Sequence, residues 1–251
     1  MSKYYRPKRF GNLYDPKSKK PYKLSRYRLD MFISCPRCFY LDRRLGIDRP
    51  PIYPMTLNIT IDGLLKKEFD YYRSVGKRHP IMEKFGLNAI PFSHPNLNKW
   101  RDSLRHGIQY YHKKTNLIIT GGVDDVWLSR DGELIIVDYK VVSNPDMAAY
   151  DPEWKKQCER QLEIYQWLFR KNGFRVKDVG YFLLCVCKKN KKIFNNILEF
   201  EMKIVPHKGD DSWIEQSIIE AHLCLNSTKI PSKGHKCDLC LYWEEVRKNI
   251  K

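Results

Sequence analysis

The chain has 251 residues, 42% of them hydrophobic and 13% aromatic, and it carries a formal net charge of +17. This apolar content is enough for a packed core, which excludes a wholly disordered protein. No apolar run approaches the roughly 18–20 residues that span a bilayer, and the basic N-terminus lacks the apolar segment of a secretory signal. We therefore expect a soluble, cytoplasmic protein with no membrane partner.

The first 28 residues carry much of the positive charge, with ten Lys or Arg and a single acid. We interpret residues 1–24 as an extended basic and aromatic arm and residues 25–251 as one domain. Such an arm can stack on bases and contact phosphates, so the expected partner is nucleic acid, and DNA in particular. The same pattern also fits a solubilising tail with no fixed contact.

Along the chain, hydrophobic periodicity and capping residues alternate between helical and extended patterns. They predict helices at 25–34, 61–74, 95–111, 152–172 and 212–225, and strands at 117–128, 133–141, 181–187 and 197–205. Asp151 followed by Pro152 is a clear helix start, because aspartate caps a first turn and proline suits its first position. The mixture predicts an α/β fold with a central sheet flanked by helices.

The predicted strand at 133–141 carries residues suited to chemistry. Its apolar run leads into Asp138, Tyr139 and Lys140, so Asp138 and Lys140 share one face and Tyr139 points to the other. A carboxylate and an amine at the end of a buried strand lose hydration unless they pair or bind a ligand. They form either a simple ion pair or part of a catalytic site.

The turn before this strand decides which residue lies opposite Asp138. A three-residue loop at 130–132, with a left-handed glycine, places Asp124 opposite Asp138 with their Cβ atoms about 5 Å apart. Two carboxylates that close repel each other unless they share a proton or a divalent cation. Oxygen ligands suit Mg²⁺ or Mn²⁺. A two-residue loop would place Asp125 on that face instead.

A third acid is expected from the helix at 61–74. Ile61, Leu65 and Tyr72 mark its predicted buried stripe, and Glu68 falls within that stripe. A carboxylate among apolar side chains needs a partner, so Glu68 is the candidate third metal ligand. The alternative is a glutamate at the edge of the stripe that reaches solvent.

Four of the eight cysteines form two CxxC pairs, Cys35 with Cys38 and Cys237 with Cys240. A CxxC pair can place two thiolates on one metal, so two such pairs in an intracellular chain predict a four-thiolate site. Zn²⁺ and an iron–sulfur cluster both accept this ligand set. The other four cysteines lie in apolar segments, and we interpret them as small buried side chains.

These motifs resemble those of the PD-(D/E)XK nuclease superfamily, in its RecB-like branch, over about residues 25–243. The matching segments are Gly122-Val123-Asp124 for the acidic motif, Asp138-Tyr139-Lys140 for the D-x-K motif, and Gln161 with Tyr165 for the QxxxY helix. The resemblance implies a restriction-endonuclease-like core. It also implies a metal held by Asp124, Asp138, Glu68 and the Tyr139 carbonyl, with Lys140, Gln161 and Tyr165 completing the catalytic site.

The cysteines extend the resemblance. Some RecB-like nucleases, including AddB and CRISPR-associated members, hold a [4Fe–4S] cluster between an N-terminal cysteine and a C-terminal group of cysteines. By this resemblance the two CxxC pairs would hold such a cluster, with structural Zn²⁺ as the alternative. The third C-terminal cysteine of those proteins is missing near Val246, and Cys38 is the candidate replacement.

The implied function is a Mg²⁺- or Mn²⁺-dependent deoxyribonuclease in DNA repair, recombination or CRISPR-type defence. Many members have a histidine four residues after a helical glycine, but here Lys67 stands four residues after Gly63. The alternative is therefore a catalytically weak or inactive nucleic-acid-binding protein, or an assembly subunit of a larger complex.

Overall fold

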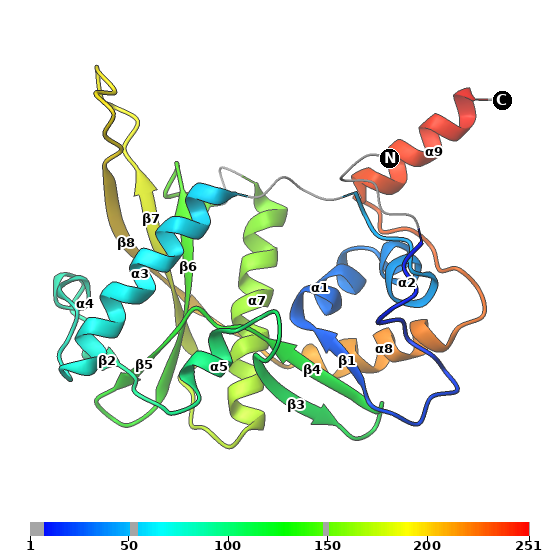
Figure 1. Ribbon diagram of the computed structural model, residues 1–251, viewed down its shortest axis with the longest axis horizontal. Coiled ribbons are helices and arrows are strands. Elements are labelled where there is room, and N and C mark those ends of the chain that lie inside the picture. The colour runs from blue at the N-terminus through cyan, green and yellow to red at the C-terminus, as the bar shows by residue number, and fades with distance from the viewer. Residues whose placement is uncertain (1–7, 51–54, 148–150, 251) are drawn as a thin grey trace. The chain divides into compact units, whose positions relative to one another are not determined.

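The computed structural model describes residues 8–50, 55–147 and 151–250. The chain divides into two compact units (Figure 1). The first unit falls within residues 1–54, 111–119 and 212–251, and the second unit falls within residues 55–110 and 120–211. In the described part of the chain, no helix is long and apolar enough to cross a membrane.

The second unit is built on a five-stranded mixed sheet with the order β2-β5-β6-β7-β8. The pairing of β6 with β7 is parallel, and the other neighbours are antiparallel. The strands are β2 (Ala89–Pro91), β5 (Asp125–Ser129), β6 (Leu134–Val142), β7 (Val179–Cys187) and β8 (Phe200–Lys208). The fold is thus the predicted α/β class, with a central mixed sheet flanked by helices.

The β5–β6 hairpin has the predicted three-residue turn. Gly132 adopts a φ of +76°, which a residue without a Cβ reaches easily, and Ser129 N donates to Glu133 O at 3.0 Å. The ladder pairs Asp125 with Val137, so its next step places Asp124 beside Asp138. The register that brings these two aspartates together is therefore present.

One face of the sheet is covered by α3 (Thr56–Ser74), and α4 (Pro80–Lys84) packs into the same core. Ile61, Leu65 and Phe69 of α3 are buried there, four residues apart in each step, which is one face of a helix. Phe69 stacks on Trp127 of β5 at a centroid distance of 5.5 Å. This helix begins five residues earlier than predicted, and Phe69 rather than Tyr72 packs into the core.

The helix α7 (Pro152–Lys171) packs on β6 from the opposite face of the sheet. It begins as predicted, since Asp151 Oδ1 accepts a hydrogen bond from Glu153 N at 2.8 Å. Leu162 lies fully buried against Gly180 of β7. This helix is the element that later supplies polar partners to the end of β6.

The prediction of one helix over residues 95–111 was wrong for the second half of that range. Only the short helix α5 (Leu97–Arg101) forms there, and strand β3 (Ile108–His112) follows it. Trp100 is buried against Phe169 in an edge-to-face contact, so the start of the pattern does form a helix. Ile108 and His112 are the buried ends of the strand, a spacing of four that fits either period.

The described residues of the first unit form one strand and four helices that lie wholly within it, namely β1 (Tyr22–Ser25), α1 (Arg26–Ser34), α2 (Pro36–Leu45), α8 (Ile214–Asn226) and α9 (Asp238–Asn249). Helices α1 and α2 pack on each other and on α8. A three-stranded sheet has the order β1-β4-β3, with β4 at Leu117–Gly121, and the chain passes between the units within β3 and β4. The predicted strand at 117–128 is thus divided between two sheets.

Residues 8–24 differ from the predicted extended arm, because they pack within the first unit. Tyr14 and Leu24 are buried. Arg9 forms ion pairs with Asp42 at 2.9 Å and with Asp48 at 3.2 Å. Residues 1–7 of the predicted arm lie outside the described residues.

Candidate active site and four-cysteine metal site

Asp138 and Lys140 lie at the end of the buried part of β6 and share a polar partner on α7. The Asp138 carboxylate is fully buried and forms an ion pair with the Lys140 ammonium. Gln161 donates from Nε2 to Asp138 Oδ1 at 2.8 Å and accepts from Lys140 Nζ at 3.4 Å. Gln161 therefore fixes the acid and the amine with respect to each other.

Tyr165, one turn beyond Gln161 on α7, extends this group. Its hydroxyl oxygen accepts a hydrogen bond from Gln161 Nε2 at 3.1 Å. A Cβ on Gly121 would come within 2.6 Å of the Tyr165 ring, so glycine is what allows this close approach. The QxxxY pair of the sequence thus positions the β6 residues.

Asp124, the residue before β5, faces the same cluster. Its Oδ2 accepts a hydrogen bond from Tyr139 N at 2.9 Å, and its Oδ1 lies 3.3 Å from the Lys66 ammonium. Arg101 holds the Asp124 carbonyl through Nε at 3.0 Å. The aspartate is therefore fixed by backbone contacts while its carboxylate faces the cluster.

The two aspartates differ in how readily they ionise. Burial, reinforced by the neighbouring Asp124 charge, raises the pKa of Asp138 to about 7 even though the Lys140 ammonium opposes this shift. Burial also acts to raise the pKa of Asp124, but Lys66 and Lys140 outweigh it and hold that pKa below its usual value. Such divergent environments within one pair are a frequent property of functional sites.

Lys140 remains a cation. Burial alone would lower its pKa, but the Asp138 carboxylate outweighs burial and the pKa is raised. A protonated ammonium cannot accept a proton from water. Lys140 is therefore suited to orienting a nucleophile or stabilising negative charge rather than acting as a base.

Asp125, which a different turn would have placed beside Asp138, belongs to a separate structural network. It is fully buried and accepts hydrogen bonds from the Tyr139 hydroxyl at 2.9 Å and from Trp127 Nε1 at 3.1 Å. It also pairs with the guanidinium groups of Arg73 and Arg101. These contacts satisfy the buried carboxylate on the α3 face of the sheet.

Glu68 does not join the two aspartates in this structure. Its side chain is 55% exposed, and its carboxylate contacts His79 Nε2 at 2.9 Å. The prediction that Glu68 lies within the buried stripe was wrong, because the stripe runs through Phe69 and turns Glu68 toward α4.

Asp62 and Lys66 of the same helix are the residues that reach the cluster, and neither was predicted from the sequence. Lys66 Nζ lies 2.7 Å from Asp62 Oδ2 as well as 3.3 Å from Asp124 Oδ1. The carboxylates of Asp62 and Asp124 therefore both contact the Lys66 ammonium. The signal was an acid four residues before a lysine on a predicted helix, which is the spacing of neighbours on one face.

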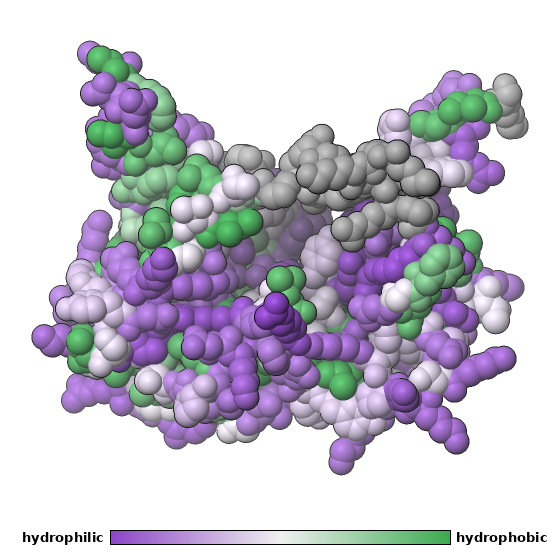
Figure 2. All heavy atoms as spheres, viewed as in Figure 1, coloured by the Kyte–Doolittle hydropathy of each residue, from purple (hydrophilic) through white to green (hydrophobic). Residues whose placement is uncertain are grey.

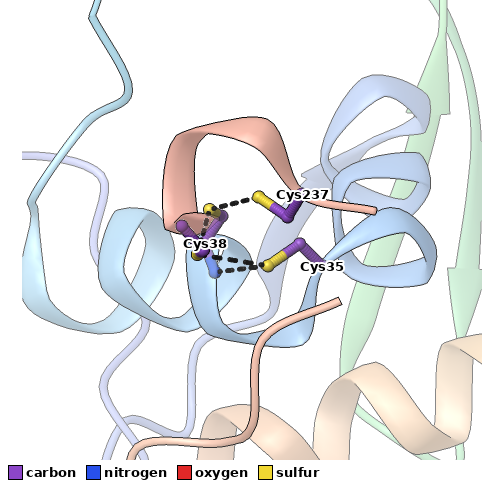
Figure 3. Close-up of side chains that lie close together, drawn as sticks. Cys35, Cys38 and Cys237 are labelled. Atoms are coloured by element: carbon purple, nitrogen blue, oxygen red, sulfur yellow. Dashed lines mark hydrogen bonds between the residues drawn. The ribbon is translucent and has the colours of Figure 1, made fainter. Parts of the chain in front are cut away.

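The two CxxC pairs converge within the first unit, although 199 residues separate Cys38 from Cys237. Each pair begins at a helix N-cap, with Cys35 before α2 and Cys237 before α9, and ends in the first helical turn. The four sulfur atoms all lie within 4.8 Å of one another, and the cysteines are free thiols (Figure 3). The predicted four-thiolate cluster is therefore present and can hold a metal.

Within this cluster, backbone donors favour the thiolate form of Cys35, whereas burial raises the pKa of Cys38 to about 11 and also raises that of Cys240. Cys35 Sγ accepts hydrogen bonds from Gly234 N at 3.2 Å and from Cys38 N at 3.5 Å. Burial opposes ionisation, but these hydrogen bonds hold the pKa of Cys35 at about 7. Thiolates are the form that binds metals, and helix N-termini promote it.

Sulfur separations distinguish the two kinds of metal centre. Three of the six separations are 3.5 Å for Cys38 with Cys237, 3.6 Å for Cys38 with Cys240 and 3.8 Å for Cys35 with Cys240, and all six are within 4.8 Å. Four thiolates around one zinc ion, at a bond length of about 2.3 Å, lie about 3.8 Å apart. In a [4Fe–4S] cluster each thiolate binds a separate iron, which requires wider spacing.

The remaining cysteines stand apart from this cluster. Cys158 and Cys185 are buried, whereas Cys187 and Cys224 are partly buried. Burial raises the pKa of Cys185 and of Cys224 to about 11, so these two side chains behave as inert thiols.

The sequence profile of the PD-(D/E)XK nuclease superfamily matches residues 61–244, which include the aspartates, Lys140 and the QxxxY helix. The chain belongs to this superfamily. No curated protein matches the chain. PD-(D/E)XK nucleases typically use divalent metal ions. The residues present fit such an ion by the chemistry of their donors, because Asp124 and the buried Asp138 supply carboxylate oxygens, although Asp138 Oδ2 is paired with the Lys140 ammonium.

Proposed function

We propose that this PD-(D/E)XK protein is a divalent-metal-dependent nuclease of the RecB-like branch that hydrolyses phosphodiester bonds in DNA. The observation that carries the proposal is the convergence of Asp124, Asp138 and Lys140 at the end of β6, with Gln161 locking the last two together. Repair, recombination or CRISPR-type defence is the proposed setting, alone or as a subunit of a larger complex.

Each residue has a role in this reaction. Asp124, Asp138 and the Tyr139 carbonyl would hold Mg²⁺ or Mn²⁺, with Asp62 as the third acid in place of Glu68. When bound, such an ion lowers the pKa of a water ligand and stabilises negative charge on the phosphate. Lys140 orients the attacking water and offsets charge on the phosphoryl oxygens, while Gln161 and Tyr165 keep its ammonium in place.

The direct test is a cleavage assay of the purified protein on labelled single-stranded and double-stranded DNA, with an RNA of the same sequence alongside. We expect cleavage with Mg²⁺ or Mn²⁺ and none in EDTA. Cleavage that survives EDTA, or no cleavage with any divalent ion, would contradict the proposal.

A second candidate is a nucleic-acid-binding protein with little or no activity. The observation in its favour is that Lys66 already places a positive charge between Asp62 and Asp124, in addition to Lys67 in the position of the usual histidine. DNA binding without cleavage under every metal condition would support this reading over the first.

The role of Asp62 can be separated from that of Glu68. Asp62→Asn should raise the Mn²⁺ concentration needed for half-maximal cleavage by about 10–100-fold, the range seen when groups around a metal are removed. Glu68→Gln is the matched control on the same helix, and we expect a change of less than about twofold because Glu68 contacts His79. A larger effect of Glu68→Gln than of Asp62→Asn would restore Glu68 as the third acid.

The basic segment before β1 is expected to bind phosphates. Its described residues include the exposed Lys17, Lys19 and Lys20, which lie close together in the sequence. Changing all three to glutamine should flatten the log–log salt dependence of DNA binding by about 0.7–0.9 for each phosphate that the protein no longer neutralises. The control is a triple change of the exposed Lys77, Lys84 and Lys99. Equal slopes for the segment variant and the wild type would remove this surface from the interface.

For the four-cysteine site we propose one structural Zn²⁺ ion. The resemblance to AddB-type and CRISPR-associated nucleases favours a [4Fe–4S] cluster, but three sulfur separations of 3.5–3.8 Å, with all six within 4.8 Å, fit a single tetrahedral ion. Bound there, the ion would join α2 to α9 in the first unit.

A further inference from the structure

The β7–β8 hairpin of the second unit continues past its regular ladder into a closed tip. The ladder ends where Cys187 pairs with Phe200. At the far end Asn195 and Asn196 have φ values of 50° and 58°. Two consecutive residues with positive φ form the type I′ turn that closes a β-hairpin, and asparagine is favoured there. The tip is therefore a formed element.

Apolar side chains flank this turn and face solvent. Phe194 and Ile197 lie on either side of the two asparagines, joined by a hydrogen bond from Ile197 N to Phe194 O at 3.0 Å, and they are 63% and 61% exposed. Their neighbours Ile193 and Leu198 are 73% and 46% exposed. A cluster of exposed large apolar residues marks an interaction surface rather than a fold requirement.

Lysines surround the apolar tip. Between residues 188 and 199 the hairpin carries four lysines and one acid, Glu199. Glu199 pairs with Lys188 and Lys191, whereas Lys189 and Lys192 are exposed and have no carboxylate partner among the described residues. Figure 2 shows hydrophobic and hydrophilic side chains side by side on this projecting hairpin. An apolar tip flanked by positively charged lysines is complementary to nucleobases flanked by negatively charged phosphates.

The hairpin leaves the sheet at the same end as the candidate active site. Strand β7 runs parallel to β6, and Leu184 pairs with Lys140. Lys188 lies four residues beyond Leu184 and Phe194 lies ten residues beyond it, which is about 13 Å and about 33 Å for an extended chain. Figure 1 shows the hairpin continuing beyond the end of β6. A duplex that has its cleaved phosphate at Lys140 and runs along the hairpin would reach the tip within about one helical turn, which is about 34 Å.

We infer that the β7–β8 tip is a wedge that inserts Phe194 and Ile197 between bases of a DNA substrate, while Lys189 and Lys192 bind the flanking phosphates. Apolar side chains that enter a base stack unstack it, and aromatic side chains stack on the exposed bases. This inference rests on the proposed function, since it concerns how the same nuclease engages its substrate. It adds an interaction that the catalytic residues do not provide.

The test measures binding and base unstacking in the full-length protein without divalent ions, so that cleavage does not interfere. The probe is a DNA duplex with 2-aminopurine, whose fluorescence rises when the base unstacks. Phe194→Ala with Ile197→Ala should abolish the fluorescence rise and bind about tenfold more weakly, with an unchanged salt slope, because an apolar interaction releases no counterions. Lys189→Gln with Lys192→Gln should reduce the slope by about 0.9 for each phosphate left without its lysine. Leu104→Ala, 93% exposed on the same unit, is the control and should change neither value.

The outcomes separate this inference from the proposed function. A wild type that unstacks the probe but cleaves nothing with Mg²⁺ or Mn²⁺ would support the wedge and reject the nuclease. A tip variant with wild-type fluorescence and affinity would overturn the wedge, whatever the cleavage result. Loss of self-association or of a protein complex in the tip variant, with DNA binding intact, would also overturn it in favour of a protein-docking hairpin.

Discussion

Asp138→Asn and Lys140→Ala are each expected to reduce DNA cleavage by at least about 10²–10³-fold, the usual effect of losing one preorganised charged group. In the proposed mechanism Asp138 is a metal ligand, and Lys140 supplies the ammonium that Asp138 and Gln161 hold in place. DNA affinity should change little, because it comes mostly from dispersed interactions with phosphates. Single-turnover cleavage and fluorescence anisotropy measure the two quantities separately.

The control for this experiment is Lys156→Ala, which removes an exposed lysine from α7. Removing one partner of a buried ion pair can cost about 3–5 kcal/mol, so the melting temperature of each variant must be measured. If both variants remain folded and cleave at the wild-type rate, the assignment of the active site to β6 is wrong.

Cys237→Ser or Cys240→Ser should remove the bound metal and destabilise the first unit. Structural zinc sites bind with roughly 10–16 kcal/mol of apparent free energy at pH 7, and much of that energy is folding energy. Metal analysis should give one zinc per chain in the wild type and less in either variant, together with a lower melting temperature. Cys224→Ser is the matched control in the same unit, because Cys224 lies outside the four-cysteine cluster.

The same preparation distinguishes the metals. Anaerobically purified protein that is brown, absorbs broadly near roughly 400 nm and contains iron and acid-labile sulfide would replace the zinc proposal with a [4Fe–4S] cluster. Unchanged metal content and melting temperature in Cys237→Ser would reject the site for either metal.

The parts of the site that the sequence could predict depend on local rules. The turn at Gly132 fixes the register of β5 and β6. The sequence allowed two turns: the three-residue turn that forms, which brings Asp124 beside Asp138, and a two-residue turn that would place Asp125 there. The start of α7 followed from Asp151 and Pro152, and with it the position of Gln161. Spacing within each CxxC pair predicted that two thiolates would share one centre, which the convergence of the pairs bears out.

The parts that were missed depend on packing between distant segments. Phe69, rather than Tyr72, enters the core against Trp127, and this rotation of α3 turns Glu68 away and Asp62 toward Asp124. Nothing in the helical period chooses between those two rotations. Tyr14 and Arg9 likewise look like parts of a free arm until the buried Asp42 and its surroundings are known.

The separation of the two CxxC pairs has a consequence for biosynthesis. A ribosome adds about 5–20 residues each second, so roughly 200 residues between the pairs correspond to about 10–40 s. During that interval Cys35 and Cys38 have emerged without Cys237 and Cys240, and the second unit, encoded between them, has time to fold. Complete four-thiolate metallation must therefore follow synthesis of residue 240, and a chain that ends earlier cannot acquire a full ligand set. Metal occupancy would then report whether a given molecule was translated through its C-terminal cysteines.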